Sequence, residues 1–218
     1  MRVQILLGLF YCNILLSSCN SDAISDNIEA NVADTIKKDI PVDKHGNPAL
    51  YYKYKKRNDS LADLETLENG YDSLQIRIHY SNAFKNSEQV IVLRKNKSKW
   101  EGQLFDLVYN FSHNYDSLLS ISKKQIDIEP KSGWDNFIKE LYDLNILSLR
   151  DESEIKDYES YTDGYSTIVE IASQKQYRIY CYESFNSQPE SIWQAKNVEL
   201  IMKLLETEFN YKRIELSK

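Results

Sequence analysis

The sequence of 218 residues has few of the residues that short functional motifs require. It holds only six glycines, at positions 8, 46, 70, 102, 133 and 164. No two of them are close enough to form G-x-G-x-x-G or G-x-x-x-x-G-K-[ST], which excludes the glycine loops of common dinucleotide and nucleoside triphosphate sites. The same spacing excludes the G-x-S-x-G turn that carries the nucleophile of α/β-hydrolases. We therefore expect no catalytic residue of these kinds.

Histidine is equally scarce, with only three, His45, His79 and His113. They lie too far apart for an H-E-x-x-H helix or for the paired histidines of a zinc finger. A nucleophilic triad assembled by folding is not excluded by spacing, but no motif in the chain supports one. The sequence thus predicts no zinc site and no cofactor.

An acidic stretch before residue 170 matches part of a calcium-binding loop. Glu159, Asp163, Gly164 and Glu170 occupy the first, fifth, sixth and twelfth positions of that loop. Tyr161, however, stands where an oxygen ligand belongs, and the segment that follows alternates like a strand where a calcium-binding hand has a helix. We therefore interpret the stretch as a solvated loop and expect no metal.

The charge balance argues against one class of partner. The chain has 27 Lys and Arg against 33 Asp and Glu, a net charge of −6, which gives no electrostatic reason to bind nucleic acid. Hydrophobic residues make up 42% of the sequence and aromatic residues 12%, which is enough to bury a core. The length is that of one domain.

The N-terminus has the pattern of a secretory signal. Arg2 precedes a mostly apolar run from Val3 to Leu16, which is too short for a membrane-spanning helix of about 20 residues. The run ends in Leu16-Ser17-Ser18-Cys19, which resembles the lipobox of bacterial lipoproteins. The alternatives are an ordinary signal peptide with a Cys near its cleavage site, or a buried N-terminal segment of a cytosolic protein.

The lipobox resemblance implies that residues 1–18 are a signal peptide and that Cys19 receives the lipid and anchors the mature chain to a membrane. Asn20 follows the Cys where an Asp would favour the inner membrane, so the family's sorting rule points to the outer membrane. Whether the protein faces the periplasm or the cell exterior stays open. Cys181 would then be the only thiol, so no disulfide within the chain is expected, and Cys181 is interpreted as a buried strand residue.

The mature chain divides into two parts on composition. Residues 19–69 are polar and without a sustained period, and we interpret them as a tether. Within it, Tyr51 to Arg57 interleaves aromatic rings with four positive charges. This stretch could contact an anionic surface, but nearby acids cancel its charge, and a solvated stretch is the favoured interpretation. Residues 70–218 are expected to form a single domain.

The pattern in that domain is typical of an α+β fold with a largely antiparallel sheet. Strands are predicted at residues 74–80, 90–93, 100–111 and 121–128 from alternating or continuous apolar residues, with a turn near Asn96. Amphipathic helices are predicted at about 133–146 and 189–209. The order of strands, helix, strands and helix shows no β-α-β alternation. His79 is expected on the polar face of its strand.

A second hairpin is predicted from residue 167 to residue 182. A three-residue turn at 173–175 would place Ile171 opposite Tyr177, and Glu170 would form a favourable cross-strand pair with Arg178. The region from Ile121 onward, with its Gly133-Trp134 helix and Asp163-Gly164 hairpin, resembles domains of other uncharacterised bacterial lipoproteins. That resemblance implies no activity.

Tyrosine is the residue type in excess, at 16. Aromatic rings with a polar group make good contact surfaces for proteins or carbohydrates, although they are also ordinary strand residues. We predict a binding face at the second hairpin, formed by Tyr161, Tyr165, Tyr180, Tyr182 and Trp193. The expected function is that of a lipid-anchored binding protein. The alternatives are a small envelope hydrolase with scattered catalytic residues, or an inhibitor or immunity-type partner protein.

Overall fold

A seven-stranded sheet forms the centre of the fold in the computed structural model, which describes residues 36–114, 116–159 and 164–213. The strands are β1 (Lys37–Asp39), β2 (Leu74–Asn82), β3 (Ser87–Asn96), β4 (Lys99–Phe111), β5 (Leu118–Ile128), β6 (Tyr165–Ser173) and β7 (Gln176–Glu183). Their order across the sheet is β1-β7-β6-β2-β3-β4-β5. Every pairing is antiparallel except that of β1 with β7.

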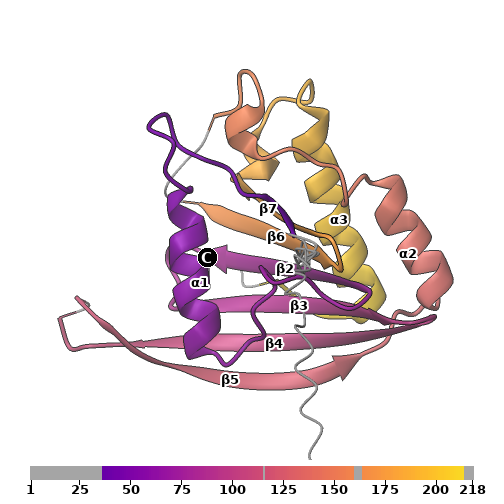
Figure 1. The fold of residues 1–218 in the computed structure, drawn as a ribbon, viewed down its shortest axis with the longest axis horizontal. Coiled ribbons are helices and arrows are strands. Elements are labelled where there is room, and N and C mark those ends of the chain that lie inside the picture. Colours follow the sequence, from indigo (N-terminus) through magenta and orange to yellow (C-terminus); the bar gives the residue numbers. More distant parts are fainter. Residues whose placement is uncertain (1–35, 115, 160–163, 214–218) are drawn as a thin grey trace, which may run out of the picture. The chain divides into compact units, whose positions relative to one another are not determined.

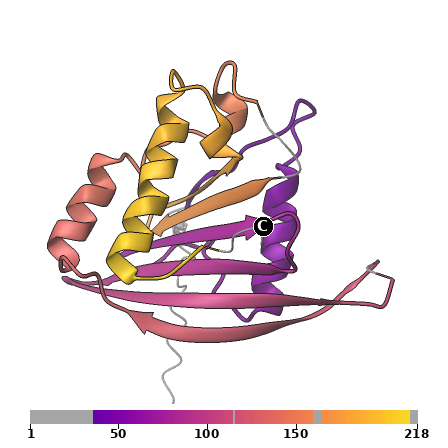
Figure 2. The ribbon, with the colours of Figure 1, turned by 180° about the vertical axis from the view of Figure 1, so that it is seen from behind.

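Helices cover both faces of this sheet (Figures 1 and 2). The helix α1 (Leu50–Leu61) crosses one face, and α2 (Trp134–Asp143) and α3 (Trp193–Phe209) lie on the opposite face. Short 3₁₀ turns at Glu152–Glu154 and Phe185–Ser187 complete the regular structure. The predicted α+β class with a largely antiparallel sheet is confirmed. None of the helices in the described part of the chain is long and apolar enough to span a membrane.

The face under α2 and α3 holds the main hydrophobic core. Alternate residues of β2 and β3, such as Ile76, Ile78 and Leu93, point to this side and are fully or almost fully buried. Met202 and Leu205 of α3 pack against them. Burial of this area supplies the main favourable free energy of folding.

The face under α1 is also buried but much more polar. Arg77 and His79 of β2 and Glu170 of β6 all point to this side, because they alternate with core residues, and all three are buried. His79 therefore lies on the polar face of its strand, as predicted, but α1 covers that face. Polar side chains removed from water in this way must be paired.

The predicted tether is wrong for its described part. The described residues belong to one compact unit, in which β1 pairs with β7 and α1 packs on the sheet. The residues of α1 that face the sheet include Tyr52, Lys55 and Asp59, spaced as one helical stripe. Two of the three are charged, so no apolar period shows in the sequence.

Cys19 and the lipobox lie outside the described residues.

The register of the second hairpin differs from the prediction by one residue. The structure pairs Ala172 with Tyr177 and Ile171 with Arg178, because the turn between β6 and β7 has two residues and not three. A shift of one residue moves side chains to the other face of a strand. Arg178 and Glu170 consequently lie on opposite faces, and the predicted pair between them does not form.

The two predicted amphipathic helices are present with shorter bounds. The first ends at Asp143, followed by Asn145 in the left-handed region. The second begins at Trp193, since Pro189 forms a separate turn in which its carbonyl accepts the N–H of Ile192. The turn near Asn96 and the strand at 121–128 are found as predicted, the latter within β5.

Candidate functional site

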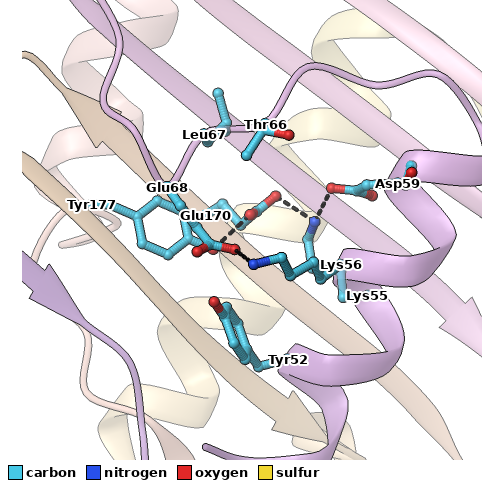
Figure 3. Close-up of a pocket in the computed structure, with 10 residues that line it drawn as sticks. Tyr52, Lys55, Lys56, Asp59, Thr66, Leu67, Glu68, Glu170 and Tyr177 are labelled. Carbon is cyan, nitrogen blue, oxygen red and sulfur yellow. Dashed lines mark hydrogen bonds and ion pairs between the residues drawn. The ribbon is translucent and has the colours of Figure 1, made fainter.

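A cluster of ionisable side chains lies between α1 and the sheet. It brings together a histidine, three carboxylates and two cationic groups from four elements, as Figure 3 shows in part. We call it the buried ion cluster, and its members are Lys55, Asp59, Arg77, His79, Glu88 and Glu170. It is the candidate site with the richest acid-base chemistry among the described residues.

Lys55 holds the centre of the cluster. Its Nζ lies 2.5 Å from Oε2 of Glu170 and also contacts Oδ2 of Asp59. Nη1 of Arg77 lies 2.8 Å from the same Asp59 oxygen and 3.4 Å from Glu170 Oε2, and Nη2 donates to the carbonyl of Glu65 at 2.9 Å. Each of these two cations is thus shared between both carboxylates.

His79 joins the cluster to the next strand. Its Nδ1 lies 2.5 Å from Oε1 of Glu88, and its Nε2 lies 3.4 Å from Oε2 of Glu170, where the geometry does not complete a hydrogen bond. Burial and the Lys55 ammonium lower the pKa of His79, but the two carboxylates outweigh them and raise it above its ordinary value. Tyr109 donates its hydroxyl to Glu88 from β4.

Glu170 is the carboxylate with the most partners. Burial raises its pKa, but Lys55, His79 and Arg77 together hold the pKa well below its usual range. The Tyr177 hydroxyl donates to its Oε1 at 2.7 Å. Glu170 is therefore a stable anion.

The charges of the cluster balance when His79 is protonated. Asp59, Glu88 and Glu170 then supply three negative charges, and Lys55, Arg77 and His79 supply three positive ones. Such a balance removes the main cost of burying ions, which is an unpaired charge in a medium of low polarity. The arrangement is that of a charge-balanced structural network.

Three of these residues have the donor atoms of a metal site. Ligand atoms of Asp59, His79 and Glu170 lie within 4.8 Å of one another. However, the Lys55 ammonium already bridges the two carboxylates, and Arg77 adds a second positive charge. A metal cation would have to displace Lys55 against this repulsion, so the donor set does not fit a metal.

The cluster is also closed to any substrate. The cavity beside it has a volume of about 30 Å³, the size of one water molecule. Figure 3 shows Tyr52, Lys56 and Glu68 along this cavity, and an ion pair of 2.9 Å joins Lys56 to Glu68. General acid-base chemistry needs contact with the reacting group, which this geometry does not allow.

The predicted tyrosine face does not form as a surface. Tyr180 and Tyr182 lie in the main core, and their hydroxyls donate to the carbonyls of Ile146 and Arg150 at 2.7 and 2.6 Å. These two rings cannot reach a partner. Tyr161 lies outside the described residues.

The other two residues of that prediction lie at separate places. Tyr165 is half-buried at the start of β6 and stacks on Tyr80, with ring centroids 5.4 Å apart. Trp193 is 53% exposed at the start of α3. Cys181 is buried in β7 as predicted, and burial raises the pKa of its thiol well above the usual range.

An open pocket of about 330 Å³ lies at one end of the sheet, and Tyr165 is part of its wall. We call it the sheet-end pocket. The end of β2, the loop that follows it, the end of β4 and the start of β6 contribute to its lining. Sequence reasoning missed it, since these segments meet only through strand pairing.

Neither a protein-family model nor a curated protein matches this chain.

Proposed function

We propose that the protein is a lipid-anchored component of the bacterial cell envelope, held at the outer membrane, whose folded unit acts by binding and not by catalysis. The anchoring part of the proposal rests on the sequence Leu16-Ser17-Ser18-Cys19 after an apolar run of signal-peptide length. The binding part rests on the chemistry of the folded unit.

The observation that carries the binding part is the closure of the buried ion cluster. His79 is 2% exposed and is held by Glu88 and Glu170, so it is not available as a general base. Asp59 and Glu170 are likewise paired with Lys55 and Arg77. In the buried ion cluster, His79 and its carboxylate partners are thus used to hold α1 on the sheet.

The anchor is tested by replacing Cys19. The full chain and a Cys19→Ala variant are expressed in a Gram-negative host fed with labelled palmitate, and the label and the membrane fraction are measured. We expect the variant to lose the label and leave the outer-membrane fraction. Cys12→Ala, inside the apolar run, is the matched control and should keep both. Equal labelling of the Cys19→Ala variant contradicts the anchor.

The absence of catalysis is tested with chromogenic esters, glycosides and phosphate esters. We expect no turnover above the rate without protein. Turnover that a His79→Gln variant abolishes, in a protein that still folds by circular dichroism, would contradict the binding function and support the hydrolase alternative.

A further inference from the structure

We propose that the sheet-end pocket binds a neutral saccharide, an inference that rests on the proposed binding function and names its ligand. The volume of about 330 Å³ is at the lower end of the range for small-molecule sites. It is about ten times the volume of the cavity beside the buried ion cluster, which is about 30 Å³. Among the described residues this pocket is thus open enough for one small ligand.

The lining combines aromatic rings with uncharged polar groups. Phe111, Tyr109 and Tyr165 supply rings, and Ser81 and Ser166 supply hydroxyls. A sugar ring presents C–H groups on its faces and hydroxyls on its edge, so it can pack on an aromatic ring while its hydroxyls bond to polar side chains. Serine hydroxyls both donate and accept, as sugar hydroxyls do.

The charges of the lining favour a neutral ligand. Among the lining residues that the structure describes, Lys85 and Glu183 are the two ionisable side chains apart from tyrosine, and they carry opposite charges. The described part of the lining contains neither an arginine nor a helix N-terminus, which are the usual means of holding a phosphate or carboxylate. Glu183 can instead accept a hydrogen bond from a sugar hydroxyl.

An unpaired buried amide supplies an independent observation. Asn82 lines the pocket and is 3% exposed. Its Oδ1 accepts the N–H of Phe84 at 2.9 Å, but its Nδ2 has no partner. Buried donors in folded proteins are nearly always paired. Because Nδ2 is itself buried, a ligand oxygen in this pocket would become its acceptor once the Asn82 amide turns toward the pocket.

The test is saturation-transfer NMR on the purified mature protein in a detergent without a sugar head group. Glucose, galactose, mannose, N-acetylglucosamine, lactose and cellobiose are added separately in the millimolar range. We expect at least one of them to bind saturably and without being hydrolysed, and glucose 6-phosphate to bind no more tightly than glucose.

Two variants locate the binding. Phe111→Ala removes a ring, and Asn82→Asp removes the amide donor while keeping the oxygen that accepts from Phe84. Each should weaken binding about tenfold, the effect expected for losing one good contact. Trp193→Ala is the control, because it removes an exposed ring that does not line the pocket, and it should bind like the parent protein.

The possible outcomes separate this inference from the proposed function. No saturable binding of any of the six sugars overturns the inference and leaves the binding function standing. The assignment to the sheet-end pocket is also overturned if Trp193→Ala abolishes saccharide binding while the folded Phe111→Ala and Asn82→Asp variants keep it. Hydrolysis of a bound disaccharide overturns the non-catalytic function but supports the location of the site.

Discussion

Replacing Glu170 by Gln should lower the free energy of unfolding by about 3–5 kcal/mol, the usual cost of removing one partner from a buried ion pair. The substitution keeps the shape of the side chain and removes its charge. Lys55 then keeps only Asp59 as an anionic partner, and Arg77 depends on that same carboxylate. The cluster changes from three balanced pairs to an excess of one buried positive charge.

The size of this loss can be compared with the stability of the whole protein. Folded domains are stable by about 5–15 kcal/mol, so one buried carboxylate accounts for a large share. For a chain of this length, each kcal/mol corresponds to about 2–4 °C in Tm. The expected decrease in Tm for Glu170→Gln is therefore about 6–20 °C.

The measurement is urea unfolding followed by far-ultraviolet circular dichroism at neutral pH. Glu101→Gln is the matched control, because Glu101 also lies in a strand and pairs with Lys99 at 3.7 Å, but the side chains are 51% and 77% exposed. Exposed pairs of this kind contribute about 0–1 kcal/mol. If Glu170→Gln costs no more than Glu101→Gln, the buried ion cluster does not hold α1 on the sheet and the reasoning is wrong.

Three further predictions follow from the same structure. Because the folded protein raises the pKa of His79, protonation of His79 stabilises the fold, fully so below about pH 6.5, and this stabilisation is lost as the pH rises through the folded-state pKa. Urea unfolding between about pH 6 and about pH 9 should therefore show a falling free energy of unfolding, and the His79→Gln variant should lack this decrease. Gly102→Ala should destabilise the protein by about 1–3 kcal/mol in thermal unfolding, because the new Cβ would lie 2.8 Å from Cη2 of Trp134; an unchanged Tm contradicts this. The thiol of Cys181 should not react with a disulfide reagent until the protein unfolds, and rapid reaction of the native protein would show that it is accessible.

The strands and the last two helices could be predicted because their buried residues are apolar and periodic. Ile76, Ile78 and Tyr80 alternate along β2, and Phe137, Ile138 and Leu141 form the buried stripe of α2. In such elements the sequence pattern and the burial have the same physical cause, the removal of apolar area from water. Element type follows from this pattern alone.

The helix α1 could not be predicted in this way, because the stripe it buries carries charges. Lys55 and Asp59 read as solvent-exposed residues in any local window. Lys55 is buried and Asp59 partly buried only because Arg77 and Glu170, far along the chain, complete their ion pairs. The position of α1 thus depends on charge pairing between segments far apart in the chain, and the periodicity of apolar residues in a short window does not reveal such pairing.

The register of the second hairpin illustrates the same limit on a smaller scale. A plausible local pair, Glu170 with Arg178, favoured the wrong turn length. In the structure Glu170 bonds instead with Arg77 of β2, and Arg178 donates to the carbonyls of Leu147 and Leu149 on the other face. The cross-strand neighbour from β2 outweighs the local one.

Lys55 is the residue that decides what the buried carboxylates do. Without its ammonium, Asp59, His79 and Glu170 would be the donor set of a metal or acid-base site, since their ligand atoms already lie within 4.8 Å of one another. With it, both carboxylates are paired and α1 closes over them. Perturbed pKa values and convergent ionisable groups therefore point here to a structural network, and the open sheet-end pocket, with Asn82 in its wall, is where we propose that a ligand binds.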